Sequence, residues 1–259
     1  MARHFADHGI RWAAIATVWF DHPKGGQPRK VWMNRPVDVL RLAEQLSLHE
    51  VKPHIWGYPW HGRIQEFLDC TSACLDGTVV GVLPDPELGL KGFPGDAHEL
   101  FLGLRHLNPY LMLGMTSYGF PRGHHLFPWE EWAEPGVTGD WQLDADYGSP
   151  QLYDQSKTKV KDGIKQWIDL GFDAICPSYG VYKVIKKDGK TSYRSMSPTE
   201  LRSHLRAFTE SGHNLPAAIG WAENLVAADC WPVIAEFAER FPVAARPWYS
   251  PRRGDSCRS

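Results

Sequence analysis

The chain lacks a long hydrophobic run. No stretch of its 259 residues approaches the ~20 apolar residues that a membrane span needs, so we expect no membrane partner. Residues 1–8 lack the apolar core of a signal peptide, which predicts a protein that is cytoplasmic as synthesised and is exported, if at all, by a non-classical route. No charge dominates: 28 Lys and Arg oppose 30 Asp and Glu, and this balance does not favour a nucleic-acid partner.

Cysteine is also scarce. The five residues are an odd number with no Cys-x-x-Cys pair, so we expect reduced, mostly buried thiols rather than a disulfide framework. A phosphate-binding Gly-rich loop, a Gly-x-Ser-x-Gly motif and a His-Glu-x-x-His motif are absent from the sequence. Nucleotide-dependent, serine-hydrolase and zinc-protease functions therefore have no motif to support them.

What the chain has in excess is tryptophan, proline and glycine, with 12, 20 and 24 residues. Many of the tryptophans stand beside Pro or Gly where strands are expected to end, which is where binding sites form. Flat aromatic rings suit the apolar faces of sugars, and they suit nucleobases as well.

Short apolar runs alternate with amphipathic segments along the chain. Strands are expected over residues 10–20, 53–60, 78–83, 110–118, 137–147, 172–177, 215–221 and 243–248, and helices over 37–48, 62–75, 96–107, 156–170, 198–211 and 225–241. A hairpin over 183–193 turns at Asp188-Gly189. This order predicts an α/β fold, a single (β/α)8 TIM barrel over residues 1–249, with 250–259 as a flexible tail; a doubly wound open sheet is the alternative.

Asp85 and Glu87 follow the third predicted strand, two residues apart. Side chains alternate across a strand, so both carboxylates point the same way. Like charges held this close cannot both ionise freely, and one tends to stay protonated as a general acid. Cleavage of a glycosidic bond needs this chemistry. The alternative is a strand end that carries two solvated acids.

In a barrel the active site lies at the carboxyl ends of the strands. We therefore predict Glu87 as general acid and Asp85 as its partner. Asp21, which ends the first strand, is predicted to join them as a catalytic carboxylate, and the candidates for the second carboxylate are Asp21, Asp144, Asp146 and Glu223. For each aromatic residue predicted to bind substrate, the alternative is a structural role in which the ring packs beneath the rim of the barrel. The predicted substrate-binding residues are Trp56, Tyr58, Trp60, Tyr118, Asp146, Tyr179, Trp221, Glu223 and Trp248.

The main alternative to catalysis by carboxylates alone is metal-dependent chemistry. His54, His61, His124 and His125 stand near predicted strand ends, but no His-x-His pair opens the first strand. Two adjacent histidines do not easily aim both rings at one ion. We predict no metal site and no cofactor, because protonation and charge stabilisation by carboxylates can lower the barrier alone.

The strand that ends in Asp85-Pro86-Glu87 resembles the Asp-x-Glu strand end of the family 25 glycoside hydrolases, lysozyme-type barrels that cut peptidoglycan. An Asp at the end of the first strand joins the pair in that family, and Asp21 stands at that place. Chitinase-like barrels are similar more weakly, through an Asp-x-Glu, a Tyr after strand six (Tyr179) and a Trp that closes strand eight (Trp248). The chitinase motif Asp-x-x-Asp-x-Asp-x-Glu is absent.

The resemblance implies a glycosidase that acts on a polysaccharide, for example an N-acetylhexosamine polymer such as peptidoglycan, as in a phage or bacterial lysin. A second hypothesis is a catalytically silent carbohydrate-binding barrel, as part of a phage or secretion particle, and a third is a metal-dependent hydrolase. The glycan, its linkage, the stereochemistry and the oligomeric state stay open.

Overall fold

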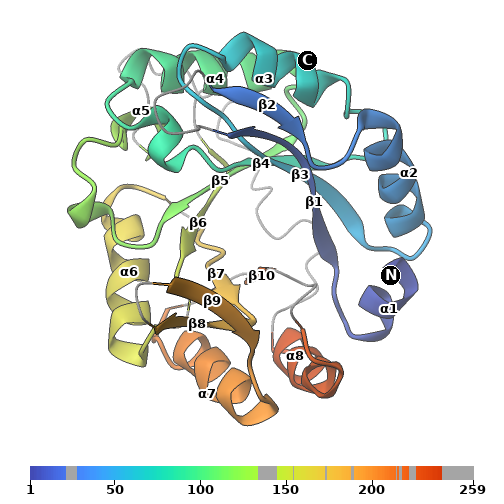
Figure 1. Ribbon diagram of the computed structural model, residues 1–259, viewed down its shortest axis with the longest axis vertical. Helices are drawn as coiled ribbons and strands as arrows, with labels where there is room; N and C mark the ends of the chain where they lie inside the picture. The colour runs from blue at the N-terminus through green and yellow to red at the C-terminus, as the bar shows by residue number, and fades with distance from the viewer. Residues whose placement is uncertain are drawn as a thin grey trace, which may run out of the picture.

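The computed structural model describes residues 1–21, 28–133, 145–153, 155–172, 174–187, 190–213, 215, 218–221 and 226–240. A curled sheet of eight strands forms its centre (Figure 1), in the order β10-β7-β6-β5-β4-β3-β1-β2. The strands of this sheet are β1 (Trp12–Asp21), β2 (Arg29–Trp32), β3 (Lys52–Tyr58), β4 (Gly81–Pro84), β5 (Met112–Tyr118), β6 (Tyr147–Gln151), β7 (Ser178–Gly180) and β10 (Ile219–Trp221). Neighbouring strands are parallel, except that β2 pairs antiparallel with β1.

The helices lie outside the curled sheet, around its circumference (Figure 1). They are α1 (Ala2–Asp7), α2 (Pro36–Ser47), α3 (Ile64–Ser72), α4 (Pro94–Leu107), α5 (Glu130–Ala133), α6 (Lys157–Asp169), α7 (Pro198–Thr209) and α8 (Trp231–Ala238), with short 3-10 helices η1 (Glu87–Leu90), η2 (Pro121–Gly123) and η5 (Ala228–Cys230). A separate hairpin, β8 (Tyr182–Lys187) with β9 (Lys190–Ser195), follows β7. Within the described ranges, no helix has the length and apolar character that crossing a membrane requires.

Local sequence explains these elements well. In α6 the Ser156 hydroxyl accepts a hydrogen bond from the Lys159 amide, which caps the helix, and Gly171 follows it with φ of 99°. Val160, Ile164 and Trp167 are fully buried at helical spacing, so α6 packs its apolar face against the sheet. The main hydrophobic core lies between the sheet and this ring of helices. Four cysteines, Cys70, Cys74, Cys176 and Cys230, are buried free thiols, as expected.

The predicted alternation of strands and helices is confirmed, with corrections to its boundaries. The fifth barrel strand is β6 rather than residues 137–147, and the sixth is β7 rather than residues 172–177. The seventh, β10, covers Ile219–Trp221 within the predicted range 215–221, and α1, β2 and α5 were not predicted. The expected eighth strand and the expected tail fall outside the described residues.

Candidate functional site: an acid pair inside the sheet

Asp85 points into the interior that the curled sheet encloses. A Cβ on Gly57 of β3 would meet Phe67 of α3, so Gly57 faces the helices and His54, of opposite parity, faces the interior. A Cβ on Gly81 of β4 would collide with the His54 ring, so Gly81 faces the interior as well. Asp85 keeps the same parity, four residues on. Its amide donates a 2.9 Å hydrogen bond to the Gly57 carbonyl, which continues the β3–β4 ladder past the end of β4. The carboxylate is buried, with 5% of the residue exposed.

Gln151, the last residue of β6, holds this carboxylate. Its Nε2 donates to both oxygens of Asp85, at 3.0 Å to Oδ1 and 3.2 Å to Oδ2. The Gln151 side chain also hydrogen-bonds Glu87, and the Trp56 side chain hydrogen-bonds Asp85. One amide on β6, two strands away from β4, therefore bridges the two carboxyl groups.

The environment favours the protonated form of both acids. Burial, the negative charge of Glu87 next to it, and only partial compensation by hydrogen bonds from Gln151 and Trp56 raise the pKa of Asp85 well above its usual value. Burial likewise raises the pKa of Glu87, against the hydrogen bond from Gln151. Because two neighbouring carboxylates resist a double negative charge, the pair retains a proton to higher pH than a solvated acid does.

Three tyrosines surround the acid pair. Burial, and then the negative charges of Glu87 and Asp85, raise the pKa of Tyr58 above its usual range and that of Tyr118 to about 12. Burial and the same acids also raise the pKa of Tyr153. These phenols therefore stay neutral near pH 7 and keep their O–H donors.

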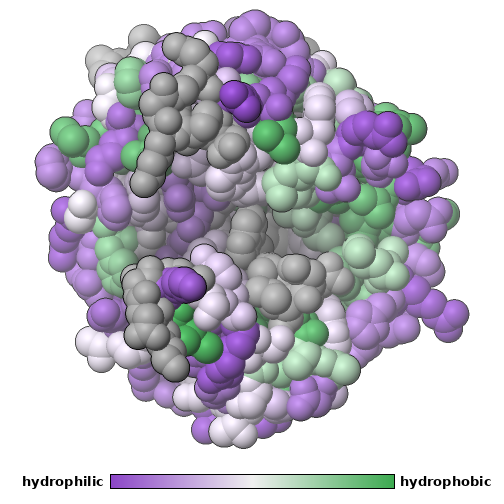
Figure 2. Space-filling model, in the orientation of Figure 1, coloured by the Kyte–Doolittle hydropathy of each residue, from purple (hydrophilic) through white to green (hydrophobic). Residues whose placement is uncertain are grey.

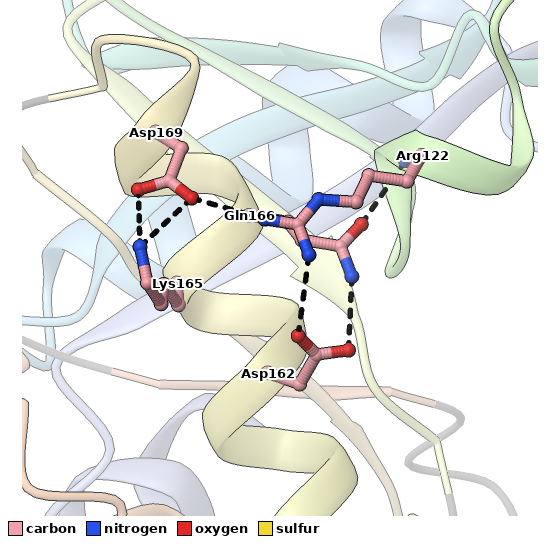
Figure 3. Close-up of polar contacts among 5 residues, drawn as sticks. All are labelled: Arg122, Asp162, Lys165, Gln166 and Asp169. Carbon is pink, nitrogen blue, oxygen red and sulfur yellow. Dashed lines mark hydrogen bonds and ion pairs between the residues drawn. The ribbon is translucent and has the colours of Figure 1, made fainter.

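The loop after β5 covers one side of this cluster. The His124 ring stacks on the Tyr118 ring with centroids 3.5 Å apart, and Phe127 meets Tyr118 edge-on at 6.0 Å. Figure 3 shows how the base of the loop is fixed to α6. The Arg122 amide donates to Gln166 Oε1 at 3.0 Å, and Gln166 Nε2 donates to Asp162 at 2.9 Å.

Replacing Gln166 tests this anchor. Gln166→Leu keeps the buried volume but leaves the Arg122 amide without its acceptor, so we expect a loss of about 1–2 kcal/mol in the free energy of unfolding. Lys165→Ala on the same helix removes only an exposed ion pair with Asp169 and should cost less than about 0.5 kcal/mol. Urea unfolding of the two variants measures the difference, and equal stabilities would show that the anchor contributes nothing.

The structure brings five of the predicted residues together: Asp85, Glu87, Trp56, Tyr58 and Tyr118. Trp60 lies behind them, 7% exposed, with its ring centroid 6.4 Å from that of Tyr58. The backbone of Asp21 ends β1, paired with Arg29. The side chains of Asp21 and Trp221, and all of Glu223, Trp248 and Asp144, are outside the described residues.

Asp146 lies at the other end of the sheet. It precedes β6, and its carboxylate accepts one hydrogen bond from the Leu113 amide at 2.7 Å and forms a 3.0 Å ion pair with Arg105 of α4. Leu113 stands at the start of β5 and Tyr118 at its end, about 16 Å apart along a strand. The predicted strand ended where β6 begins, and this shift placed Asp146 at the wrong end. Through these two contacts Asp146 links α4 to the sheet.

Tyr179 also points away from the acid pair. Its ring packs between Phe208 of α7 and Phe237 of α8, at centroid distances of 6.1 and 5.6 Å. Burial raises its pKa, and only 4% of the residue is exposed. Side chains alternate along β7, so the neighbouring Ser178 points into the interior of the sheet, where its hydroxyl lies 2.7 Å from that of Ser149.

The histidines do not converge. His54 is buried inside the sheet and desolvation lowers its pKa to about 4, His61 stacks on Phe93, and His124 stacks on Tyr118. Over the described part of the chain, no group of three or more His, Cys, Asp or Glu side chains is placed to hold a metal ion.

Comparison with solved structures identifies the architecture. The chain is similar to a chitinase-like agglutinin from Robinia pseudoacacia (TM-score 0.59, 11% identity, 92% of this chain and 96% of that one). It is also similar to a mutant GH18 chitinase from Cycas revoluta in complex with (GlcNAc)4 (TM-score 0.57, 12% identity, 92% of this chain and 95% of that one). A third similar structure is a xylanase and alpha-amylase inhibitor protein from Scadoxus multiflorus, with a TM-score of 0.56 and 10% identity over 92% of each chain. The fold is that of a TIM barrel.

At these identities the likeness is one of fold alone. No family model matches the chain, and no curated protein matches it in sequence. The TIM-barrel prediction is confirmed, and the neighbours have the fold that the chitinase-like resemblance implies. The resemblance to family 25 stays a prediction.

Proposed function

We propose that the protein is a glycoside hydrolase in which Glu87 is the general acid and Asp85 its partner. The observation that carries the proposal is the buried acid pair, bridged by Gln151 at the carboxyl ends of β4 and β6 and surrounded by neutral phenols. This end of the strands is where TIM barrels carry their active sites. Figure 2 shows one face of the molecule, whose recessed centre has mainly hydrophilic residues on its left and mainly hydrophobic residues on its right.

The different burial of the two acids assigns them different catalytic roles. Glu87 is partly exposed at the start of η1, so it can reach the leaving oxygen of a bound glycan, whereas Asp85 lies deeper. Glu87 gives the proton that the pair retains to the leaving oxygen as the glycosidic bond breaks, while the substrate's N-acetyl oxygen or a water molecule bonds to the anomeric carbon. Water completes the hydrolysis, and its proton returns to the Glu87 carboxylate. Asp85 orients the substrate's N-acetyl group or stabilises the positive charge that develops at the sugar ring. The phenols donate hydrogen bonds to substrate oxygens.

A catalytically silent carbohydrate-binding barrel is the second candidate. It is favoured by the range of proteins that share this fold, among which are an agglutinin and an inhibitor protein as well as chitinases. A silent barrel would use the same aromatic lining without proton transfer.

One assay separates the two functions. The purified protein is incubated with peptidoglycan, chitin oligomers and plant polysaccharides, and new reducing ends and binding are measured in parallel. Cleavage of one glycan supports the hydrolase. Binding without cleavage supports the silent barrel, and neither binding nor cleavage rejects both. Metal analysis of the same sample tests the metal-dependent alternative, which requires a stoichiometric ion.

The raised pKa values predict the pH profile. An acid whose pKa is raised in the folded protein keeps its proton to higher pH, so turnover should persist above the ordinary range of carboxyl groups, about pH 4–4.5, and fall only as pH rises through the raised values. In Gln151→Leu the hydrogen bonds that favour the ionised forms are gone, so this alkaline limb should move to higher pH. Initial rates from pH 4 to 9 test this, and a limb that moves to lower pH contradicts the assignment.

A further inference from the structure

Trp19 of β1 extends the aromatic lining outward from the acid pair. Its ring stacks on that of Tyr58, with centroids 4.4 Å apart and planes 22° apart, and lies 6.0 Å from the ring of Trp56. Trp56 and Tyr58 face the interior next to Asp85, so the Trp19 ring stands on the same side of the sheet.

Exposure distinguishes Trp19 from its neighbours. It is 36% exposed, whereas Trp56 and Tyr58 are 3% and 6% exposed. Its antiparallel partner in β2 is Val31, which is 45% exposed. Paired residues of neighbouring strands project from the same face, so Trp19 and Val31 form a small apolar surface at the edge of the barrel mouth. The buried Tyr58 ring supports the indole from behind and restricts its rotation.

We propose that Trp19 is the platform of a sugar-binding subsite, distinct from the position at the acid pair, which stacks the apolar face of one pyranose ring. The inference rests on the proposed function. It also sets a length requirement. Because β1, β3 and β4 are adjacent, Trp19 lies about two strand spacings, roughly 10 Å, from the strand that carries Asp85. A short oligosaccharide at the acid pair does not reach Trp19, and a longer one does.

The test compares Trp19→Ala with Trp19→Phe, which keeps an aromatic face. Tyr110→Ala is the matched control, because Tyr110 is 85% exposed and precedes β5 at the opposite end of the barrel. Calorimetry measures the affinity of the full-length protein for the glycan that the wild type binds in the panel above, supplied as oligomers from the dimer to the hexamer. Circular dichroism confirms that each variant is folded.

We expect Trp19→Ala to weaken binding of the longer oligomers about tenfold and to leave the dimer unchanged, while Trp19→Phe and Tyr110→Ala bind as the wild type does. In turnover, KM should rise with kcat unchanged, because the contact is the same in ground and transition states. Equal affinities for wild type and Trp19→Ala at every length overturn the subsite but leave the proposed function intact. A wild-type protein that binds no glycan overturns both.

Discussion

Glu87→Gln should abolish turnover while leaving glycan binding intact. The substitution keeps the shape of the side chain and its place at the start of η1, but an amide has no proton to give to the leaving oxygen. General acid catalysis contributes roughly 10²–10⁴-fold, so we expect kcat to fall by that factor with little change in affinity. Stopped assays of reducing ends, together with calorimetry, measure both quantities on one preparation.

The matched control is Glu99→Gln, which makes the same change at an exposed position of α4. It should retain wild-type kcat. If Glu87→Gln also retains kcat, Glu87 is not the acid and the proposed mechanism fails. If wild type and both variants bind glycan without turnover, the silent barrel is the correct alternative.

Much of this fold follows from the sequence because the signals were local. Apolar residues at helical spacing placed α6 almost to the residue, and the apolar run before Asp85 placed the acid pair. Asp85 continues the alternation of β4, but Glu87 begins η1, so its place beside Asp85 comes from the turn that follows the strand and not from the alternation assumed in the prediction. Burial of both acids by the closing sheet, which raises their pKa values, depends on contacts between distant segments.

Gln151 was missed for a physical reason. Its strand contains Pro150, and proline in a central strand removes a ladder hydrogen bond, so the sequence argued against a strand there. The prediction moved the strand upstream, and this exchanged the roles of its ends: Asp146 was assigned to the mouth, and the residue that contacts Asp85 was not considered. Trp19 was missed although it stands two residues before Asp21, on the same face of an ideal strand.

Asp85→Asn should remove activity and, at the same time, remove part of the pH dependence of stability. The folded protein holds the Asp85 proton more tightly than the unfolded chain does, because burial and the charge of Glu87 raise its pKa. Its contribution to stability is therefore complete below the unfolded pKa, near 4, and is lost as pH rises through the folded value. An Asn does not ionise, so the variant should gain stability relative to the wild type as pH rises from 4 to 8.

Asp76→Asn should change the pH dependence of stability in the opposite direction. Although burial opposes it, hydrogen bonds from the Thr78 hydroxyl and amide lower the pKa of Asp76, so this carboxylate stabilises the fold above its unfolded pKa and loses that effect as pH falls. The Asp76 variant should therefore lose stability relative to the wild type as pH rises. Urea unfolding at several pH values distinguishes the two. An Asp85→Asn difference that is independent of pH would mean that Asp85 titrates normally, and the acid pair would then lack the retained proton on which the mechanism depends.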